Sequence, residues 1–310
     1  MTFSRVLTLA GLALLAGRAA AEAPPVWQPS PGHAQIAVWP AAAPDPVPAG
    51  GPEKLTAMPD KVAWVERVSQ PTMTVYPPAR WNSGVAVVVF PGGGYQGLAM
   101  DLEGSEICDW LASRGITGVL LKYRVPTPKI GAYHASRQAL EDAQRTIGLV
   151  RLHADEWRID PHRIGVIGFS AGGHMAAAVS TNYRRRAYPA MDAADRESSR
   201  PDFAIALYPG HLWYEANGDA LNPEVPVDAE TPPTFLLQAE NDPVDDVTNS
   251  LTYYRVLKKA GVSAEMHLYA QGGHGFGLRR ADLPIAAWPG LVETWLGAIG
   301  MLPVKPSAAP

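Results

Sequence analysis

A serine, an acid and a histidine that together could cleave an ester or amide occur in this chain in a set order. Ser170 lies in the stretch GFSAG at residues 168–172, which fits G-x-S-x-G. In that pattern small residues flank a nucleophilic serine on a strained turn between a strand and a helix, where a neighbouring Cβ would collide with backbone. Three fixed positions can arise by chance in a chain with 29 glycines, so the motif needs partners elsewhere.

We expect His274 to be the general base for Ser170. With this motif the chain order is serine, acid, histidine, and only His267 and His274 follow the acidic segment around residue 242. His274 has glycines on both sides, in a loop that can present its ring at a sheet edge, whereas His267 falls inside an expected strand. His174, one helical turn after the serine, is interpreted as structural because it lies on a packed helix and precedes the acid.

Asp242 is the preferred acid. It follows the expected strand Thr234 to Ala239, and active-site residues of open α/β sheets gather beyond the carboxyl ends of the strands. Asp245 and Asp246 are expected to begin the next helix instead, where negative charge offsets the helix dipole. Glu240 is the reserve candidate for the acid.

The glycine run PGGGY at residues 91–95 directly follows another expected strand. Successive glycines let main-chain N–H groups turn toward one point, as the stabilisation of an oxyanion requires. We expect the donors to be the N–H groups of Gly93, Gly94 and Ala171, the last being the residue after the nucleophile. A simple glycine turn is the alternative, and a phosphate loop is disfavoured because no Lys-Ser or Lys-Thr follows.

These groups predict acyl transfer through an acyl-enzyme. Ser170 attacks an ester carbonyl, and His274 takes its proton and later gives it to the leaving alcohol. Asp242 orients the imidazole and stabilises its charged form. No cofactor and no metal are expected, because the mechanism requires neither and the sequence lacks the patterns H-E-x-x-H and C-x-x-C.

The spacing of apolar residues predicts alternating strands and helices that would hold these groups. Continuous β-branched runs such as GVAVVVF at residues 84–90 are typical of strands buried on both faces. Alternation of this kind favours an α/β fold with a mostly parallel central sheet and helices on both faces. The expected strands are 72–76, 84–90, 117–123, 163–168, 203–208, 234–240 and 264–269, and the expected helices are 102–114, 135–154, 172–181, 247–260 and 286–299.

Length and composition fit a globular protein that carries an export signal. The 310 residues are 47% hydrophobic, and a net charge of −4 argues against a nucleic-acid partner. Residues 1–21 combine Arg5, an apolar stretch and the small residues Ala19 to Ala21, as in a cleaved signal peptide. The apolar run is shorter than the ~20 residues that span a bilayer. We therefore expect a secreted or periplasmic protein with no membrane association after cleavage.

The mature chain is expected to consist of a Pro/Ala-rich leader that wraps the domain (22–70), a catalytic domain (71–302) and a tail (303–310). Between Pro24 and Pro52 no helical or strand periodicity is visible, and Trp27 and Trp39 are candidate anchors. The single cysteine, Cys108, is expected to be a buried structural thiol. The oligomeric state stays open.

The chain resembles the α/β-hydrolase superfamily of serine esterases, and within it the exported acetylxylan esterases and related carbohydrate acetylesterases. The resemblance implies an α/β-hydrolase fold and a serine carboxylesterase that removes acetyl groups from plant cell-wall carbohydrate such as acetylated xylan. Its partner would be an oligosaccharide or small-molecule ester. The similar blocks are FPGGGYQGLAMDLEG (90–104), LLKYRVP (120–126), RIGVIGFSAGGHMAA (163–177), RPDFAIALYP (200–209), TPPTFLLQAENDPV (231–244) and GGHGFGL (272–278).

Two features depart from the family pattern. Pro91 stands where many α/β-hydrolases have the histidine of H-G-G-G, so proline rigidity would position the loop. The connection 210–230, expected to roof the acyl or sugar pocket, is short. Trp213 and Tyr214 within it, together with Tyr95 in the glycine run, are candidate substrate contacts, and core packing is the alternative for the pair in the connection.

Glu103 and Arg124 are further polar residues near the glycine run. We expect a buried ion pair between them that fixes the loop, with substrate contact as the second interpretation. Asp101 belongs to the same polar set.

Other functions stay open as alternatives. A general short-chain carboxylesterase or a peptidase-like α/β-hydrolase would use the same groups. A prolyl peptidase would need a large extra domain, for which the chain before Gly84 is too short, and a lipase would favour a long apolar lid, which the sequence lacks. A non-catalytic carbohydrate-binding protein on an esterase scaffold is disfavoured because nucleophile, base, acid and oxyanion loop are all present.

Overall fold

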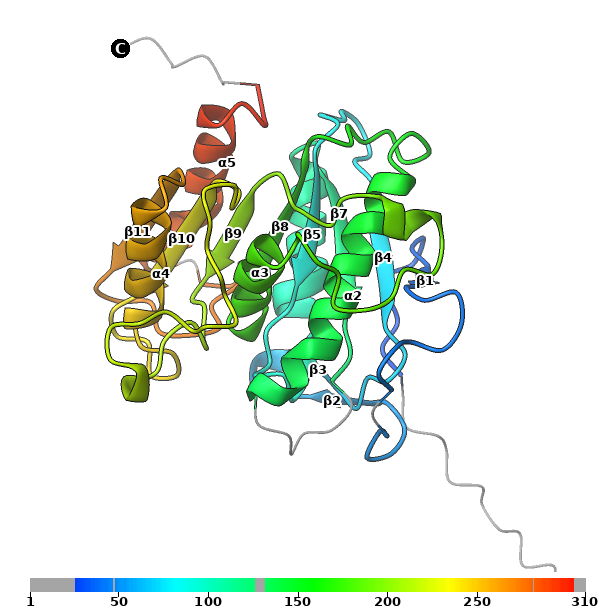
Figure 1. Cartoon of the computed structure of the whole chain (residues 1–310), viewed down its shortest axis with the longest axis horizontal. Helices are drawn as coiled ribbons and strands as arrows, with labels where there is room; N and C mark the ends of the chain where they lie inside the picture. The colour runs from blue at the N-terminus through cyan, green and yellow to red at the C-terminus, as the bar shows by residue number, and fades with distance from the viewer. Residues whose placement is uncertain (1–25, 47, 126–131, 281, 304–310) are drawn as a thin grey trace, which may run out of the picture.

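An eight-stranded sheet runs through the centre of the chain (Figure 1). The structure is a computed structural model that describes residues 26–46, 48–125, 132–280 and 282–303, without the side chains of residues 132–136 and 217. In spatial order the strands are β1 (Gln35–Ala37), β4 (Thr72–Tyr76), β7 (Thr117–Lys122), β5 (Ala86–Phe90), β8 (Ile164–Phe169), β9 (Ala204–Leu207), β10 (Thr234–Ala239) and β11 (Ala264–Tyr269). The pairs β1/β4 and β4/β7 are antiparallel, and the pairs from β7 to β11 are parallel.

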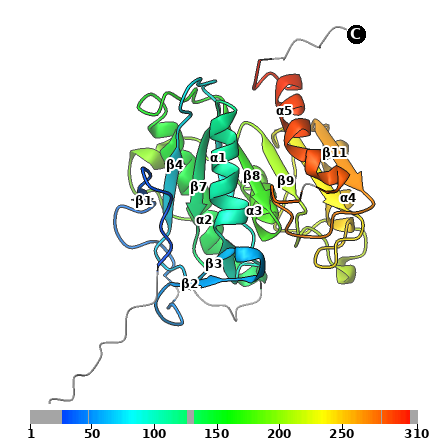
Figure 2. The same cartoon turned by 180° about the vertical axis from the view of Figure 1, so that it is seen from behind.

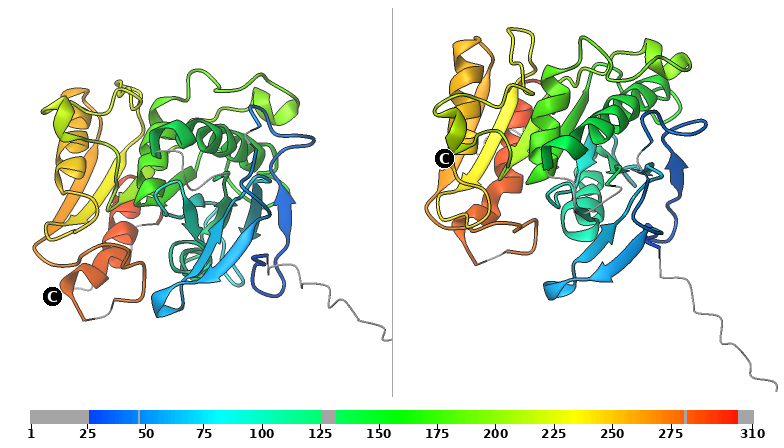
Figure 3. Two further views of the ribbon diagram at one scale, coloured as in Figure 1. Left: turned by 90° about the horizontal axis from the view of Figure 1, so that it is seen from below. Right: turned by 60° about the horizontal axis from the view of Figure 1, so that its bottom comes forward.

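Helices cover both faces of this sheet. One face carries α2 (Ala132–Leu152), α3 (Ala171–Thr181) and α4 (Thr248–Lys259), which lie toward the viewer in Figure 1. The other carries α1 (Glu106–Ser113) and α5 (Trp288–Ala298), which come forward in Figure 2, and Figure 3 shows the sheet between the two helical layers. The predicted α/β fold, with a mostly parallel sheet and helices on both faces, is confirmed.

The sequence of the central strands accounts for their position. Every residue of β5, β7, β8 and β10 is buried, and β5 reads AVVVF. Parallel strands enclosed between helices have no solvent-facing side, so apolar residues run through them without alternation. Burial of each Val or Ile side chain contributes roughly 1.5–3 kcal/mol, which makes this sheet the core of the molecule.

The strands and helices predicted for the domain are present, with ends that differ by a few residues. The largest difference concerns the predicted helix 102–114. It begins as a π-helix, Asp101–Ser105, and continues as α1. Such π-turns are often found at functional sites. Cys108 in α1 is fully buried, as predicted.

The leader contains strands that the sequence did not reveal. Between Pro24 and Pro52, where the sequence shows no strand periodicity, β1 pairs with β4. A second, antiparallel sheet joins β2 (Lys54–Ala57), β3 (Ala63–Glu66) and β6 (Gly97–Ala99). Strands of three or four residues are too short to show an alternating pattern, and cross-strand pairing rather than local sequence determines them.

Two tryptophans of the leader are buried in the domain. Trp27 and Trp39 are each 5% exposed and belong to the main hydrophobic core. The indole N–H of Trp39 donates to Asp142 Oδ1 at 2.7 Å, and Asp142 lies on α2. The leader is thus attached to the domain by packing and by a buried hydrogen bond.

The predicted signal segment 1–21 lies outside the described residues, as does most of the predicted tail, 304–310. Within the part of the chain that is described, none of the helices has the length and apolar character needed to cross a membrane.

Candidate active site

Ser170 lies on the turn between β8 and α3 with φ of 54° and ψ of −121°. A positive φ is uncommon for a residue with a side chain, so the surrounding structure must hold the serine in this conformation. A Cβ on Gly168 would overlap the carbonyl group of Gly172, and a Cβ on Gly172 would overlap that of Phe90. The turn therefore requires both glycines of the predicted motif.

The three residues predicted as nucleophile, base and acid lie in hydrogen-bond contact. His274 Nε2 is 2.9 Å from Ser170 Oγ, and His274 Nδ1 is 2.8 Å from Asp242 Oδ2. When Nδ1 donates to the carboxylate, Nε2 is the ring nitrogen that can accept the hydroxyl proton. This geometry allows a proton to leave Ser170 as its oxygen attacks a carbonyl carbon.

Local hydrogen bonds hold the acid and the histidine loop. The side chain of Asp242 is fully buried, and its Oδ1 accepts the N–H groups of Val244 and Asp245 at 2.9 and 3.0 Å. Asn241 Oδ1 accepts two N–H groups of the histidine loop, at residues 272–273, at distances of 3.0 and 2.9 Å. The end of β10 thereby positions both partners of the imidazole ring.

The pKa of His274 is raised. Burial by itself would lower it, but the hydrogen bond to Asp242 and the charge of that carboxylate outweigh burial. The charges of Asp245 and Glu103 act in the same direction. The surroundings therefore favour the imidazolium that forms when the ring takes a proton.

Asp245 lies beside Ser170, and the prediction that it begins the next helix was wrong. Its Oδ2 is 3.4 Å from Ser170 Oγ and 3.8 Å from His274 Nε2. Only Asp246 acts as predicted, accepting a main-chain N–H at the start of α4. The cause is the tight turn closed by Asp242 Oδ1, which holds the N–H of Asp245 and directs that residue to the serine.

The predicted oxyanion loop runs from β5 to β6 and passes next to the nucleophile. A Cβ on Gly92 would lie 2.8 Å from Ser170 Cβ, so the loop could not approach as closely with a larger residue. Gly93 and Gly94 have φ of 142° and 60°. Among the hydrogen bonds of the described residues, none uses the N–H of Gly93, Gly94 or Ala171. These three N–H groups are therefore available to a ligand oxygen.

The leader supports this loop from the outside. Trp64 on β3 packs against it, since a Cβ on Gly93 would lie 3.0 Å from the Trp64 ring. Asp101 Oδ1 accepts the N–H of Ala63 at 2.8 Å, which ties β3 to the π-helix. The sequence did not reveal this support, because β3 and β6 are too short to be recognised.

Glu103 fixes the loop, but it does so without Arg124, so the predicted ion pair was wrong. Glu103 Oε2 accepts the N–H of Gly92 at 2.7 Å, and Oε1 accepts the hydroxyl of Tyr208 at 2.8 Å. Burial raises the pKa of Glu103, and these two hydrogen bonds oppose the rise. The carboxyl group is 4% exposed and joins two segments on either side of Ser170.

Arg124 belongs to a separate buried cluster with α2. Its Nη2 is 2.9 Å from Glu141 Oε2 and 3.0 Å from Asp142 Oδ1, and all three side chains are buried. Neither strand pattern nor spacing could show that α2 would supply two carboxylates to Arg124, because the pairing depends on how α2 crosses the sheet.

The remaining predicted residues lie as follows. Tyr95 is fully buried, with its hydroxyl 2.6 Å from His174 Nδ1. Burial lowers the pKa of His174 to about 3, which agrees with the structural role predicted for it. Trp213 and Tyr214 are half-buried in the connection 210–230. The structure does not test substrate contact for Tyr95, Trp213 or Tyr214.

The reserve acid Glu240 and the alternative histidine His267 form no hydrogen bond with Ser170 among the described residues. His267 pairs with Glu265 on β11 at 2.8 Å, and Glu240 is exposed at the end of β10. Within the described residues, no group of three or more His, Cys, Asp or Glu side chains is arranged to hold a metal ion.

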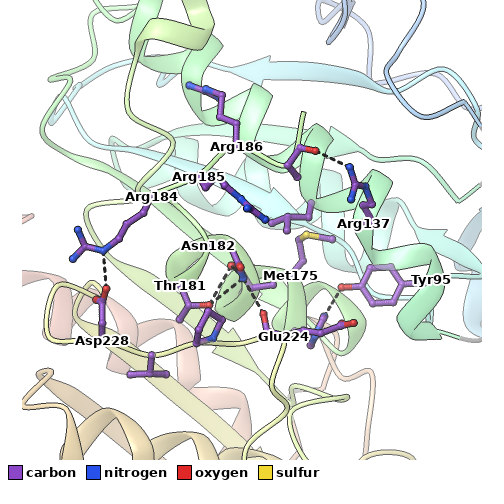
Figure 4. A pocket seen from close by; sticks show the side chains of 16 residues that line it. Tyr95, Arg137, Met175, Thr181, Asn182, Arg184, Arg185, Arg186, Glu224 and Asp228 are labelled. Atoms are coloured by element: carbon purple, nitrogen blue, oxygen red, sulfur yellow. Dashed lines mark hydrogen bonds and ion pairs between the residues drawn. The ribbon is translucent and has the colours of Figure 1, made fainter. Parts of the chain in front are cut away.

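A cavity of about 820 Å³ lies along α3 (Figure 4). Ser170, Asp242 and His274 are not among its lining residues. The connection 210–230, predicted to roof the substrate pocket, contributes four lining residues to this cavity. Figure 4 shows arginines around it, among them Arg184, whose Nε pairs with Asp228 at 3.0 Å. The four residues from the connection are Glu224, Pro226, Val227 and Asp228.

Residues 87–278 match the family described as the alpha/beta hydrolase fold. The chain belongs to the α/β-hydrolase family. The matched segment covers more than half of the chain and includes Ser170, Asp242 and His274. The predicted resemblance is confirmed at this level.

Similar proteins include esterases and enzymes of xylan breakdown. The chain is 31% identical over 218 residues to an acetylxylan esterase of Xylanibacter ruminicola, covering 63% of this chain and 42% of that protein. It is 27% identical over 221 residues to endo-1,4-beta-xylanase B of Butyrivibrio fibrisolvens, covering 66% and 34%. The chain thus spans less than half the length of these two curated relatives.

A solved structure extends the similarity over most of the chain. The acetyl ester-xyloside bifunctional hydrolase of Caldicellulosiruptor lactoaceticus is 33% identical, with a TM-score of 0.69. The similarity covers 87% of this chain and 97% of that one. Relatives named as esterases agree with the predicted class, a carboxylic ester hydrolase.

Proposed function

We propose that the chain is a serine esterase that hydrolyses short-chain esters, acetyl esters above all, through an acyl-enzyme. The observation that carries the proposal is the position of the His274 ring, 2.9 Å from Ser170 Oγ on one side and 2.8 Å from Asp242 on the other. A neutral imidazole held in this way is a general base for the serine.

In the acylation step Ser170 Oγ bonds to the ester carbonyl carbon while His274 Nε2 takes the hydroxyl proton. The C–O bond to the alcohol then breaks, and Nε2 returns the proton to the leaving oxygen. In deacylation a water molecule gives a proton to the same nitrogen and attacks the acyl carbon. The bond from that carbon to Ser170 Oγ then breaks, Nε2 returns the proton to Oγ, and the acid is released. Asp242 keeps the ring oriented and stabilises its positive charge throughout.

We assign the oxyanion hole to the main-chain N–H groups of Gly93, Gly94 and Ala171. The availability of these three donors supports the assignment, as does the close packing of Gly92 against the serine. Loss of one such donor typically raises a barrier by ~3 kcal/mol, so the conformation of the glycine loop is central to the rate.

The proposed substrates are acetylated carbohydrates of the plant cell wall, such as acetylated xylan. Similarity to an acetylxylan esterase and to an acetyl ester-xyloside bifunctional hydrolase supports this substrate class. Tyr95, Trp213 and Tyr214 stay candidate sugar contacts. A general preference for small acetyl esters is the outcome expected if carbohydrate is not the natural substrate.

We further propose that the protein is exported and that residues 1–21 are removed. The n-region, apolar stretch and small residues at the start of the sequence support this proposal. Expression of the full chain followed by N-terminal sequencing of the exported protein tests it, and a retained Met1 would overturn it.

The activity is tested with para-nitrophenyl acetate and para-nitrophenyl octanoate, comparing the wild type with Ser170→Ala. We expect the wild type to prefer the acetate and Ser170→Ala to lose nearly all activity. Ser180→Ala, which removes another buried serine hydroxyl on α3, is the matched control and should stay active. Equal activity of Ser170→Ala and wild type would refute the mechanism, and a preference for octanoate would refute the acetyl assignment. Acetate release from acetylated xylan then tests the carbohydrate substrate.

A further inference from the structure

Asp245 is a partly buried carboxylate that the proposed mechanism does not use. Its side chain is 15% exposed, and its Oδ2 lies 3.4 Å from Ser170 Oγ and 3.8 Å from His274 Nε2. A Cβ on Gly210 would overlap Asp245 Oδ1, so the carboxylate packs directly against the backbone of that glycine.

This carboxylate has hydrogen-bonding capacity that the described residues do not fill. A carboxylate can accept about four hydrogen bonds. Among the described residues, the side chain of Asp245 accepts only the long one from Ser170. The neighbouring carboxylates differ, because Asp242 has a partner on each oxygen and so has Glu103. Partial burial removes some of the hydration of this carboxylate, so a donor on a bound ligand can replace water there with a charge-assisted hydrogen bond.

The position of Asp245 corresponds to the leaving-group side of the reaction. The leaving oxygen must come within hydrogen-bond reach of His274 Nε2, about 3 Å, to take its proton. Oδ2 is 3.8 Å from the same nitrogen, so a group attached next to the leaving oxygen comes within reach of Asp245. The acyl carbonyl, by contrast, is directed to the N–H groups of the glycine loop.

We propose that Asp245 accepts a hydrogen bond from a free hydroxyl on the carbon next to the ester-bearing carbon, and so selects esters of vicinal diols such as partly acetylated sugars. This inference rests on the proposed function and specifies its alcohol. A hydroxyl fits better than an ammonium group, because a cation there would lie beside the imidazolium that forms on His274. An anionic alcohol would be repelled by Asp245.

Two small esters test the proposal: ethylene glycol monoacetate and its methyl ether, which differ in one hydrogen-bond donor. We expect the wild type to have the higher kcat/KM on the glycol monoacetate. Asp245→Asn keeps the shape but lacks the charged acceptor, and it should reduce this preference by about tenfold or more, since hydrogen bonds to charged groups are the strong ones. Rates are measured at a pH well above the pKa of His274, so that the ring is neutral in every variant.

Asp246→Asn removes the adjacent carboxylate and is the matched control, with the wild-type preference expected. Para-nitrophenyl acetate, whose alcohol has no hydroxyl, gives the reference rate for each variant, so that the ratio of the two glycol ester rates is compared and not their absolute values. Asp245→Ser provides a second neutral variant if the first unfolds. A wild-type enzyme with no preference for the glycol ester, or a preference that survives in both Asp245 variants, would overturn the proposal.

Two further outcomes distinguish this proposal from a cation site and from failure of the proposed esterase function. A preference for acetylcholine over the glycol ester would overturn the choice of a hydroxyl and indicate a cation site. Absence of any hydrolysis above that of Ser170→Ala would refute the proposed function itself, whereas hydrolysis with an unchanged ratio would refute only the role of Asp245.

Discussion

Glu103 Oε2 accepts the main-chain N–H of Gly92 at 2.7 Å, and its other oxygen accepts the hydroxyl of Tyr208 at 2.8 Å. Gly92 begins the glycine loop, and Tyr208 directly follows β9. One buried carboxylate therefore joins the segments on the two sides of Ser170. Because both partners are hydrogen-bond donors, each carboxylate oxygen of Glu103 must act as an acceptor.

Glu103→Gln should lower kcat by about tenfold to a hundredfold with little effect on KM, which is less than the roughly 10²–10³-fold loss that follows complete removal of an oxyanion donor. The amide has only one acceptor oxygen and would direct its NH₂ group at a donor, which would displace the loop. Steady-state kinetics with para-nitrophenyl acetate measure the change. Glu106→Gln, at a partly exposed carboxylate on α1, is the control. A lower melting temperature with unchanged kcat would contradict the prediction.

Asp242→Asn should reduce kcat by about 10⁴-fold, because an amide at this position stabilises the wrong tautomer of the imidazole and cannot balance its positive charge. The fold should persist, since the Asn side-chain oxygen can still accept the N–H groups of Val244 and Asp245. Burst and steady-state kinetics give kcat, and circular dichroism checks the fold. Loss of less than tenfold in a folded variant would assign the acid role to another residue.

When kcat/KM is plotted against pH, it should fall on the acid side (the acid limb) with an apparent pKa above the ordinary imidazole value of about 6.5. The reason is that His274 accepts a proton only when neutral, and its pKa is raised. Asp245→Asn removes one of the negative charges that raise this pKa, so the limb should move to lower pH. Asp242 and Glu103 stay and keep part of the rise. A limb that stays in place or moves upward in Asp245→Asn would contradict this assignment, and Asp246→Asn should leave it unchanged.

Asp142→Asn should lower the free energy of unfolding by about 3–5 kcal/mol, because it leaves the buried Arg124 with weakened compensation. It also weakens the hydrogen bond that attaches Trp39 of the leader. Urea unfolding measures the loss. Asp45→Asn removes one of the two carboxylate partners of Arg137, in an exposed ion pair, and should cost less than ~1 kcal/mol. If the two substitutions lowered the free energy of unfolding equally, the prediction that a partner lost from the buried cluster costs more than one lost at the surface would be refuted.

Gly168→Ala should abolish activity and destabilise the fold, because the new Cβ would overlap the carbonyl group of Gly172 and force the elbow open. Gly290→Ala on α5 adds the same methyl group where nothing lies within 4 Å. That control should keep full activity and stabilise by up to ~1 kcal/mol, the helix preference of alanine over glycine. Melting temperature and esterase rate together distinguish the two. An active Gly168→Ala variant would show that the turn can relax.

Local sequence patterns determine much of the secondary structure of this protein and the order of its elements without reference to tertiary contacts. The β-branched runs and the small-residue segment after Ser170 specify strands and a helix through the backbone preferences of their own residues. The glycines of the elbow and of the loop 91–95 are required by steric contacts within a few residues. Because these constraints are local, the fold class, the order of elements and the prediction of Ser170, Asp242 and His274 followed from the sequence.

Tertiary structure alone decided which groups surround those three. Asp245 lies 75 positions from Ser170, and Glu103 lies 105 positions from Tyr208. Such contacts depend on the direction of a turn or the crossing of a helix, and composition and periodicity do not encode either. The short strands of the leader likewise exist only because partner strands are near. The sequence thus determined the proposed reacting groups, whereas the packing of distant segments decided what holds the glycine loop and which carboxylate lies beside Ser170.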